Sequence, residues 1–356
     1  MLKVRLLKVL DRYLGNAAVF FLRKPLPVVG HAPRTILFIR PGGIGDAVLL
    51  LHAIRLVKAK YPACTITVLA ERRNAAIFFF CGAVTRILLY DHISDLLAVV
   101  RGGFDVVIDT EQWHRLSAVV ARLTGAPLLI GFATNSRKKL FTHAIEYSHD
   151  TYEGESFLAL LNPLGILPPD QPELSLEIPP QVAANVEKKL AVLTGKSYIV
   201  LFPGASIPER RWGTKKFQDL ARKINDLGFP VVVVGGRGDE TAGNDILSGG
   251  AGFNFAGKTS LAETAAILAH SRLLVTGDSG LLHIAAELKV PTISLFGPGI
   301  EKKWAPRDAR HLVLNKQLDC SPCTRFGSTP RCRIGARCLA LITVADVEKA
   351  IRGILG

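Results

Sequence analysis

Residues 40–62, RPGGIGDAVLLLHAIRLVKAKYP, decide the fold of this chain. The apolar run TILFIR (35–40) predicts a buried strand, and the residues after Asp46 carry apolar side chains at helical spacing. The turn between them, which brings the backbone close to whatever lies above the sheet, contains Gly42, Gly43 and Gly45. Asp46 opens the helix, where its side chain can cap free N–H groups and the helix dipole favours its charge.

Asp46 has two interpretations, a structural cap or a general base. The rival for the whole turn is a dinucleotide-binding site, but Val48 stands where the third Gly or Ala of that fingerprint belongs. An acid at the mouth of the turn would also repel a pyrophosphate. Asp46 therefore fits a base better than part of a phosphate cradle. Glu71 ends the next predicted strand where such a fold has its ribose acid, which keeps a dehydrogenase open as an alternative.

Composition points to a globular protein of two domains with an anionic partner. The chain has 356 residues, 49% hydrophobic and 21% charged, and its net charge is +14. A strongly basic balance suits nucleic acid, acidic lipid headgroups or a phosphorylated substrate. We expect no nucleic-acid partner, because the sequence has neither an aromatic-rich RNA motif nor zinc-finger spacing. Six cysteines are too few and too unevenly placed for a secreted disulfide scaffold.

Residues 1–33 form a separate basic segment. Leu2, Leu6, Leu10 and Leu14 fall four apart on one helical stripe, and a single acid, Asp11, faces six cations. These cations are Lys3, Arg5, Lys8, Arg12, Arg23 and Lys24. The apolar run at 17–22 is far shorter than the roughly 20 residues that span a bilayer, and no small-residue cleavage site of a signal peptide follows. The pattern favours an amphipathic helix on an anionic membrane surface, the alternative being a helix packed on the domain.

The rest of the chain alternates strands with helices, which predicts the α/β class with doubly wound parallel sheets. The first series contains apolar runs at 35–40, 65–71, 76–82, 86–91 and 104–110. The Pro-rich stretch 167–181 is the candidate linker, after which the series restarts at 197–206, 230–240, 272–280 and 291–299. We therefore expect two Rossmann-like domains, residues 34–175 and 176–356, facing each other across a cleft.

Three segments of the second half follow predicted strands, so their side chains should meet at one edge of a parallel sheet. Arg210 could clamp a diphosphate, although a solvated basic helix start is the plain alternative. Glu240, in the Gly-rich turn GGRGDE, could accept both hydroxyls of a ribose, or the turn could serve without a ligand. The helix start at Asp278, Ser279 and Gly280 offers N–H groups to an anion. His283, one turn further, is either packed or a phosphate or sugar contact.

Three segments of the chain resemble, in their order and spacing, the family 9 heptosyltransferases of lipopolysaccharide core assembly. They are RPGGIGDAVLLLHAIR, PGAS…RRW and VTGDSGLLHIAAELKVPTISLFGP. The resemblance covers roughly residues 34 to 300. It implies the GT-B fold, with the acceptor on the N-terminal domain and ADP-heptose on the C-terminal domain. It assigns the base to Asp46, and the neighbouring glycines Gly43 and Gly45 form the acceptor-side turn. The donor residues that it implies are Ser206, Arg210, Glu240, Thr259, Asp278, Ser279 and Gly280. His283 joins them as a donor contact because of its place one turn into the same helix.

Within this assignment Ser206 and Arg210 bind the diphosphate, Glu240 the ribose and Thr259 the adenine. Asp278, Ser279 and Gly280 form the phosphate turn. One departure is that members of the family have Lys where this chain has Arg210, which keeps the charge and changes its geometry.

The implied reaction is a one-step displacement that inverts the anomeric centre. We expect no catalytic metal, because the chain contains no Asp-x-Asp triplet, and no cofactor. The implied acceptor is a phosphorylated lipid A–Kdo-type glycolipid, and the implied location is the cytoplasmic side of the bacterial inner membrane. The acceptor sugar and the donor are not fixed by sequence, so transfer from another nucleotide sugar and a Rossmann-type nucleotide binder remain alternatives.

Four cysteines near the C-terminus, Cys320, Cys323, Cys332 and Cys338, have the spacing C-x2-C-x8-C-x5-C. Clustered thiols can hold a structural zinc ion, but this spacing is compact for a zinc ribbon and no predicted strand pair brackets it. A zinc site, a disulfide and free thiols therefore all remain open.

Overall fold

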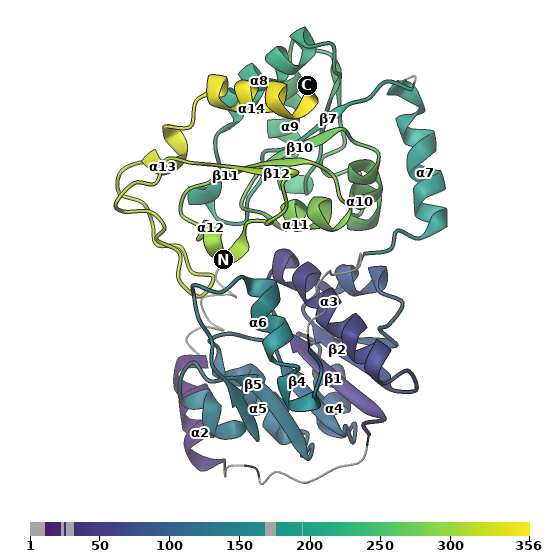
Figure 1. Ribbon diagram of the computed structural model, residues 1–356, viewed down its shortest axis with the longest axis vertical. Coiled ribbons are helices and arrows are strands. Elements are labelled where there is room, and N and C mark those ends of the chain that lie inside the picture. Colours follow the sequence, from purple (N-terminus) through teal and green to yellow (C-terminus); the bar gives the residue numbers. More distant parts are fainter. Residues whose placement is uncertain (1–10, 23–24, 26–31, 168–175, 194) are drawn as a thin grey trace. The chain divides into compact units, whose positions relative to one another are not determined.

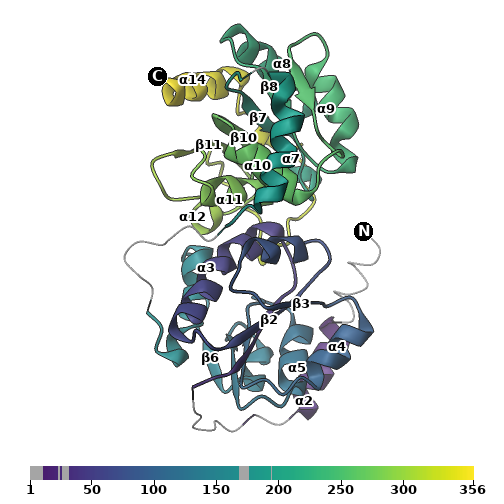
Figure 2. The same ribbon diagram turned by 90° about the vertical axis from the view of Figure 1, so that its right-hand side faces the viewer.

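The computed structural model of the chain describes residues 11–22, 25, 32–167, 176–193 and 195–356. The chain divides into two compact units, residues 1–175 and 176–356. Each unit contains one parallel six-stranded sheet between two layers of helices (Figures 1 and 2). The predicted class, α/β with two doubly wound parallel sheets, is confirmed. The predicted stripe of Leu2, Leu6 and Leu10 with Lys3, Arg5 and Lys8, together with most of the Pro-rich stretch, lies outside the described residues.

The sheet of the first unit has the strand order β3-β2-β1-β4-β5-β6. Its strands are β1 (Thr35–Arg40), β2 (Thr65–Ala70), β3 (Arg86–Leu89), β4 (Val106–Asp109), β5 (Leu128–Phe132) and β6 (His143–Ile145). Its helices are α2 (Asn16–Phe21), α3 (Ile44–Lys60), α4 (Ile93–Val100), α5 (Arg115–Leu123) and α6 (Glu153–Ala159). Helices α3 and α6 pack together, and α2 and α4 pack on α5 (Figure 2). Because both faces are covered, the central strands read as nearly continuous apolar runs.

The sheet of the second unit has the order β12-β11-β10-β7-β8-β9, which is the same topology. Its strands are β7 (Ile199–Phe202), β8 (Val231–Val233), β9 (Gly252–Asn254), β10 (Leu273–Gly277), β11 (Thr292–Phe296) and β12 (His311–Asn315). Its helices are α7 (Pro180–Leu190), α8 (Thr214–Asp226), α9 (Glu240–Leu247), α10 (Leu261–Ala269), α11 (Gly280–Glu287), α12 (Glu301–Trp304), α13 (Arg337–Ala340) and α14 (Val344–Leu355). Figure 1 shows α8, α9 and α14 on one side of this sheet and α10 and α11 on the other.

Short helical turns complete the chain. They are the π-helix η1 (Asp11–Gly15) and the 3-10 helices η2 (Ala75–Phe80), η3 (Ser136–Leu140), η4 (Asn162–Leu164), η5 (Ala191–Leu193), η6 (Pro208–Arg210) and η7 (Arg237–Asp239). The strand expected at 76–82 is therefore wrong. The side chain of Asn74 bonds the N–H of Glu71 at 2.9 Å and the carbonyl of Arg40 at 3.0 Å, which turns the chain away from the sheet. The run forms part of the crossover between β2 and β3, where Ile77, Phe78 and Phe80 are buried and Phe79 is exposed.

The described part of the basic N-terminal segment packs on the first unit. Asp11 is 5% exposed, and its Oδ1 accepts the N–H groups of Arg115 at 2.7 Å and Leu116 at 2.8 Å, at the start of α5. Val19 of α2 is buried in the core of this unit, whereas Phe20 and Phe21 are 81% and 79% exposed. Among the described residues, no helix combines the length and the apolar character needed to cross a membrane.

Candidate functional site

Each sheet reverses its strand order beside its first strand. β1 lies between β2 and β4, and β7 lies between β8 and β10. Loops that leave two such neighbouring strands turn to opposite faces, so a crevice opens at their carboxyl ends, where open α/β sheets bind ligands. The candidate base of the first unit and the candidate diphosphate-binding residues of the second unit lie at these switch points.

Asp46 lies in the first turn of α3, above the end of β1. The helix starts one turn earlier than expected, with Gly43 as its N-cap and Gly45 as its second residue, and it has no side-chain cap hydrogen bond. The interpretation of Asp46 as a helix cap is therefore wrong. Its carboxylate instead faces Arg40, with 3.6 Å between Asp46 Oδ2 and Arg40 Nη2, and remains 22% exposed. Asp46 is therefore paired with an arginine and still accessible to a ligand.

Arg40, the last residue of β1, is 2% exposed and is held by the backbone. Its Nε donates to the carbonyl of Pro41 and its Nη1 to that of Thr110, each at 2.8 Å. The guanidinium occupies the space next to Gly42, where an added Cβ would lie 2.7 Å from Arg40 Nη2. Gly42 also has φ +122°, a conformation that side chains rarely adopt. The glycine-rich turn therefore makes room for an arginine of the chain itself.

Arg40 also pairs with Glu111, which follows β4, with 3.7 Å between Nη2 and Glu111 Oε2. Burial alone would raise the pKa of Glu111, but the guanidinium of Arg40, followed by His114 and Arg137, holds that pKa below its ordinary value. Glu111 is therefore charged, and one guanidinium serves two carboxylates. Neither Arg40 nor Glu111 is among the predicted site residues. The signal in the sequence that could have identified them is a charged residue at or just after the end of β1 and of β4, the two neighbouring strands at the switch point.

Arg137 and Asp109 form a second buried ion pair under this pair of carboxylates, and neither side chain is exposed. Arg137 also donates to the carbonyl of Glu111 and to Ser117 Oγ. On the other side, Tyr147 donates to Glu153 Oε2 at 3.0 Å. Burial, and next the carboxylate of Glu153, raise the pKa of Tyr147, and the charge of Asp46 adds to this effect. Tyr147 is thus a neutral neighbour of Asp46.

In the second unit, Arg210 and Asp278 meet across the switch point. Arg210 ends η6 after β7, Asp278 follows β10, and 2.9 Å separates Arg210 Nη1 from Asp278 Oδ2. The two side chains are 15% and 9% exposed. Arg210 Nη2 lies 3.4 Å from Thr324 Oγ1, and Arg210 Nε is buried without a hydrogen-bond partner among the described residues. The guanidinium therefore has one unsatisfied donor that is closed to solvent, while the side chain as a whole remains partly exposed.

The helix after β10 begins at Gly280, where the sequence predicted a helix start. Ser279 is the N-cap of α11, its Oγ accepts the N–H of Leu282 at 3.4 Å, and Gly280 is the first helical residue. His283 is 3% exposed, on the buried side of this helix. A helix start with a small N-cap residue can receive an anion.

The other predicted donor residues are spread along the same edge of the sheet. Ser206 follows β7 and Glu240 begins α9 after β8, and both side chains are exposed. Thr259 follows β9, and its hydroxyl bonds Phe255 O at 3.3 Å and Thr264 Oγ1 at 3.0 Å. Within the described part of the chain, no hydrogen bond or ion pair links these three residues to Arg210 or Asp278.

Asp239, next to Glu240, is a residue that the sequence reasoning missed. Its carboxylate accepts the N–H of Gly236 at 3.0 Å, and an added Cβ at Gly204 or Gly235 would lie 2.6 or 2.8 Å from it. Asp239 therefore fills the space that two glycines leave and holds the loops after β7 and β8 together.

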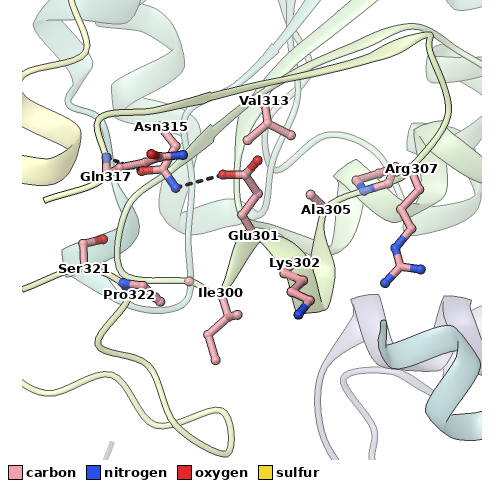
Figure 3. Close-up of a pocket in the computed structure, with 12 residues that line it drawn as sticks. Ile300, Glu301, Lys302, Ala305, Arg307, Val313, Asn315, Gln317, Ser321 and Pro322 are labelled. Carbon is pink, nitrogen blue, oxygen red and sulfur yellow. Dashed lines mark hydrogen bonds between the residues drawn. The ribbon is translucent and has the colours of Figure 1, made fainter. Parts of the chain in front are cut away.

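A pocket of about 690 Å³ lies in the second unit at the ends of β11 and β12. Glu301 and Asn315 turn toward each other across it, with 2.9 Å between Glu301 Oε2 and Asn315 Nδ2, whereas Lys302 and Arg307 both point downward in Figure 3. Gly299, which also lines the pocket, abuts Asp278, because an added Cβ there would lie 2.2 Å from Asp278 Oδ2. The pocket thus adjoins the Arg210–Asp278 pair and offers polar groups that suit a sugar.

The four clustered cysteines are free thiols. Within the part of the chain that the structure describes, no group of three or more His, Cys, Asp or Glu side chains is arranged to hold a metal ion. Of the three interpretations of the cluster, the structure therefore contains neither the disulfide nor a formed zinc site.

The geometry can be set beside known proteins. Residues 96–332, well over half of the chain, match glycosyltransferase family 9 (heptosyltransferase). The chain is 25% identical over 294 residues to lipopolysaccharide heptosyltransferase 2 of Escherichia coli K12, covering 74% of this chain and 82% of the relative. It is 29% identical over 290 residues to lipopolysaccharide heptosyltransferase 3 of the same organism, with the same coverage.

Among solved structures, the chain resembles ADP-heptose lipopolysaccharide heptosyltransferase II of E. coli, with a TM-score of 0.73 and 23% identity. The match covers 90% of this chain and 98% of that one. This likeness confirms the predicted GT-B fold.

Proposed function

The chain belongs to glycosyltransferase family 9, and we propose that it transfers a heptose from ADP-heptose to the inner core of lipopolysaccharide. The observation that carries this proposal is the similarity over 74% of the chain to two enzymes named lipopolysaccharide heptosyltransferases. The two switch points supply matching chemistry, because one carries an accessible carboxylate and the other carries an arginine beside a helix N-terminus.

In the proposed reaction, Asp46 is the general base. It takes the proton from an acceptor hydroxyl as that oxygen attacks the anomeric carbon on the face opposite the diphosphate. Arg40 pairs with the charged carboxylate, and its two backbone hydrogen bonds limit how far the guanidinium can move. Attack from the opposite face in one step inverts the anomeric centre. Gly43 and Gly45 keep the acceptor side of this turn free of bulky side chains.

The donor binds the second unit. Arg210 and the N–H groups at Ser279 and Gly280 bind the diphosphate and stabilise the leaving ADP, so positive charge comes from the protein. Ser206 and His283 add contacts to the phosphates or the sugar, and Asp278 fixes Arg210.

The nucleoside lies along the same edge of the sheet. Glu240, whose side chain is exposed, accepts the ribose hydroxyls. Thr259 contacts the adenine. The polar pocket beside Gly299 suits the hydroxyl groups of the heptose.

The proposed acceptor is a phosphorylated lipid A–Kdo-type glycolipid, reached at the cytoplasmic face of the inner membrane. The net charge of +14 supports an anionic surface as a partner. Two exposed aromatic residues on α2, Phe20 and Phe21, follow directly after the basic N-terminal stretch, a combination typical of helices that lie in a membrane interface. Peripheral attachment through this segment would bring the enzyme to its lipid substrate.

A ligand panel followed by a transfer assay tests the proposed function. Thermal unfolding is measured with ADP, UDP, GDP, CMP and NAD at equal concentration, and we expect the largest rise in Tm with ADP. Transfer from ADP-heptose to purified inner-core acceptor is then measured, and the anomeric configuration of the product is read by NMR. A preference for NAD would replace this proposal with a dinucleotide-dependent enzyme, and a product that retains the donor configuration would exclude the one-step displacement.

A further inference from the structure

The cysteine-rich loop, residues 316–336 between β12 and α13, contacts the proposed donor site. Two of its backbone N–H groups, those of Cys323 and Thr324, donate to the carbonyl of Pro298 at 3.1 and 2.9 Å. Ser321 Oγ donates to the carbonyl of Gly297, and Cys338 Sγ lies 2.8 Å from where a Cβ at Gly297 would stand. The turn Gly297–Gly299 that leaves β11 is therefore held by the cysteine-rich loop and by α13, the helix that follows it.

The same turn lies against Asp278 on its other side. Gly299 leaves no room for a side chain, because an added Cβ would lie 2.2 Å from Asp278 Oδ2. Asp278 pairs with Arg210, and Arg210 Nη2 returns to Thr324 Oγ1 at 3.4 Å. The contacts thus form a closed ring through the loops after β7, β10 and β11 and the cysteine-rich loop.

Thr324 is the member of the ring that links the cysteine-rich loop directly to Arg210. It is 1% exposed, and its hydroxyl lies 2.7 Å from Thr329 Oγ1 as well as within reach of Arg210. A hydroxyl with two such neighbours has a fixed direction, since it can donate to Thr329 and accept from the guanidinium. With Nη1 on Asp278 and Nη2 on Thr324, the guanidinium plane is set and its Nε is the donor without a partner among the described residues.

We propose that the cysteine-rich loop is a working part of the donor site and that Thr324 is a positioning residue, which orients Arg210 toward the diphosphate of the donor. The proposal rests on the donor role of Arg210 given above. It gives this loop a function that needs neither a metal ion nor a disulfide. It also implies that the loop acts on phosphate recognition and leaves recognition of the nucleoside unchanged.

The test compares ADP with adenosine, which lacks the phosphates. Thr324→Val removes the hydroxyl with little change in shape and should raise the Kd of ADP about 3- to 10-fold, as expected for one modest hydrogen bond. The Kd of adenosine should stay the same. Thr324→Ser should restore ADP binding. In the transfer assay, Thr324→Val should raise the KM for ADP-heptose and also lower kcat, because Arg210 both binds the diphosphate and stabilises the leaving ADP. Thr292→Val is the control, because its buried hydroxyl contacts His311 and not Arg210.

A double-variant comparison separates this inference from the proposed function. In an Arg210→Gln background, Thr324→Val should weaken ADP binding no further, because both changes act through one guanidinium. Equal loss of ADP and adenosine affinity, or additive losses in the double variant, would overturn the positioning role. If Arg210→Gln itself left ADP affinity unchanged, the proposed donor role of Arg210 would fail instead. Thr324→Ala replaces the valine variant if that variant does not fold, with the same expected results.

Discussion

The first strand of each sheet, β1 and β7, lies at a switch point and is associated with an arginine, but the two arginines have different surroundings. Arg40 is 2% exposed, donates to two backbone carbonyls and is shared by Asp46 and Glu111. Arg210 is 15% exposed, has one carboxylate partner and keeps its Nε without a partner among the described residues. All three nitrogens of the first guanidinium have a partner in the protein, whereas the second guanidinium has partners on two nitrogens and a more exposed side chain.

This difference indicates a division of labour between the switch points. A buried, fully bonded arginine cannot easily leave its partners, because an uncompensated buried charge is costly. It is therefore suited to holding a catalytic carboxylate in place. A more exposed arginine with fewer partners is suited to binding an anionic ligand that comes and goes. The predictions below test this division.

The largest expected effect is on the rate, from Asp46→Asn. Loss of the base should lower kcat roughly 100- to 10,000-fold, while the Kd of ADP should stay within a few-fold, because Asp46 acts on the acceptor. Steady-state kinetics and calorimetry measure the two quantities. Near-normal turnover would remove Asp46 from the mechanism, and a parallel loss of ADP affinity would break the division between the two switch points.

Arg40→Met should lower the free energy of unfolding by about 3–5 kcal/mol, because Glu111 and Asp46 lose their shared counterion in a buried setting. Denaturant unfolding measures this change. Adding Glu111→Gln to this variant should recover part of the loss, since one buried charge is removed. Arg211→Gln is the matched control, because Arg211 is an exposed arginine whose side chain, among the described residues, bonds the carbonyl of Ala205 and no carboxylate. Equal stability of Arg40→Met and the wild type would show that the first switch point is not a coupled network.

A third prediction concerns the membrane and the surface of the first unit. Deleting residues 1–10 removes Lys3, Arg5 and Lys8, and each cation is worth about 1 kcal/mol at an anionic surface, so binding to anionic vesicles should fall clearly. The deletion stops before Asp11 because this residue caps α5 and a longer deletion would disturb the fold. Co-sedimentation with vesicles at increasing salt measures the effect.

A double variant on α2 sharpens the same test. Phe20→Ser with Phe21→Ser should also reduce vesicle binding, and this loss should depend less on salt because it comes from apolar contacts. Val192→Ser, an exposed apolar residue of the second unit, is the control. Full retention of both variants on vesicles would place the membrane-binding surface elsewhere, for which Lys138 and Lys139 are the next candidates.

The smallest expected effect is the pH dependence of stability due to Glu111. Its folded pKa lies below its ordinary value of 4.5, so its charged form stabilises the folded protein. This contribution is complete above the ordinary pKa and is lost as the pH falls through the lower folded pKa. The difference in unfolding free energy between the wild type and Glu111→Gln should therefore shrink below about pH 4.5. A difference that grows on acidification would contradict the stated direction of the pKa shift. Glu146→Gln, at an exposed carboxylate of the same unit, is the control for the amide substitution.

Several predictions from sequence depended only on local patterns. Apolar runs bounded by glycine turns located the central strands of both sheets. The glycine-rich turn after the first strand also singled out Asp46 as the candidate base. The run at 76–82 was misassigned because a short apolar segment has no periodicity that separates a strand from a buried turn. What decided it was Asn74, which bonds a carbonyl 34 positions away in sequence.

Sequence alone thus determined the two parallel sheets, the glycine turns at their carboxyl ends and the residue types that those turns present. Only the tertiary structure decided which of these side chains meet. Arg40 pairs with Glu111 because β1 and β4 are neighbours, and Arg210 meets Thr324 because a loop 114 positions later folds back on the turn after β11. Strand formation follows from local periodicity. Contacts between distant residues depend instead on strand order and loop packing, and the sequence around one residue does not show which distant residue it will contact.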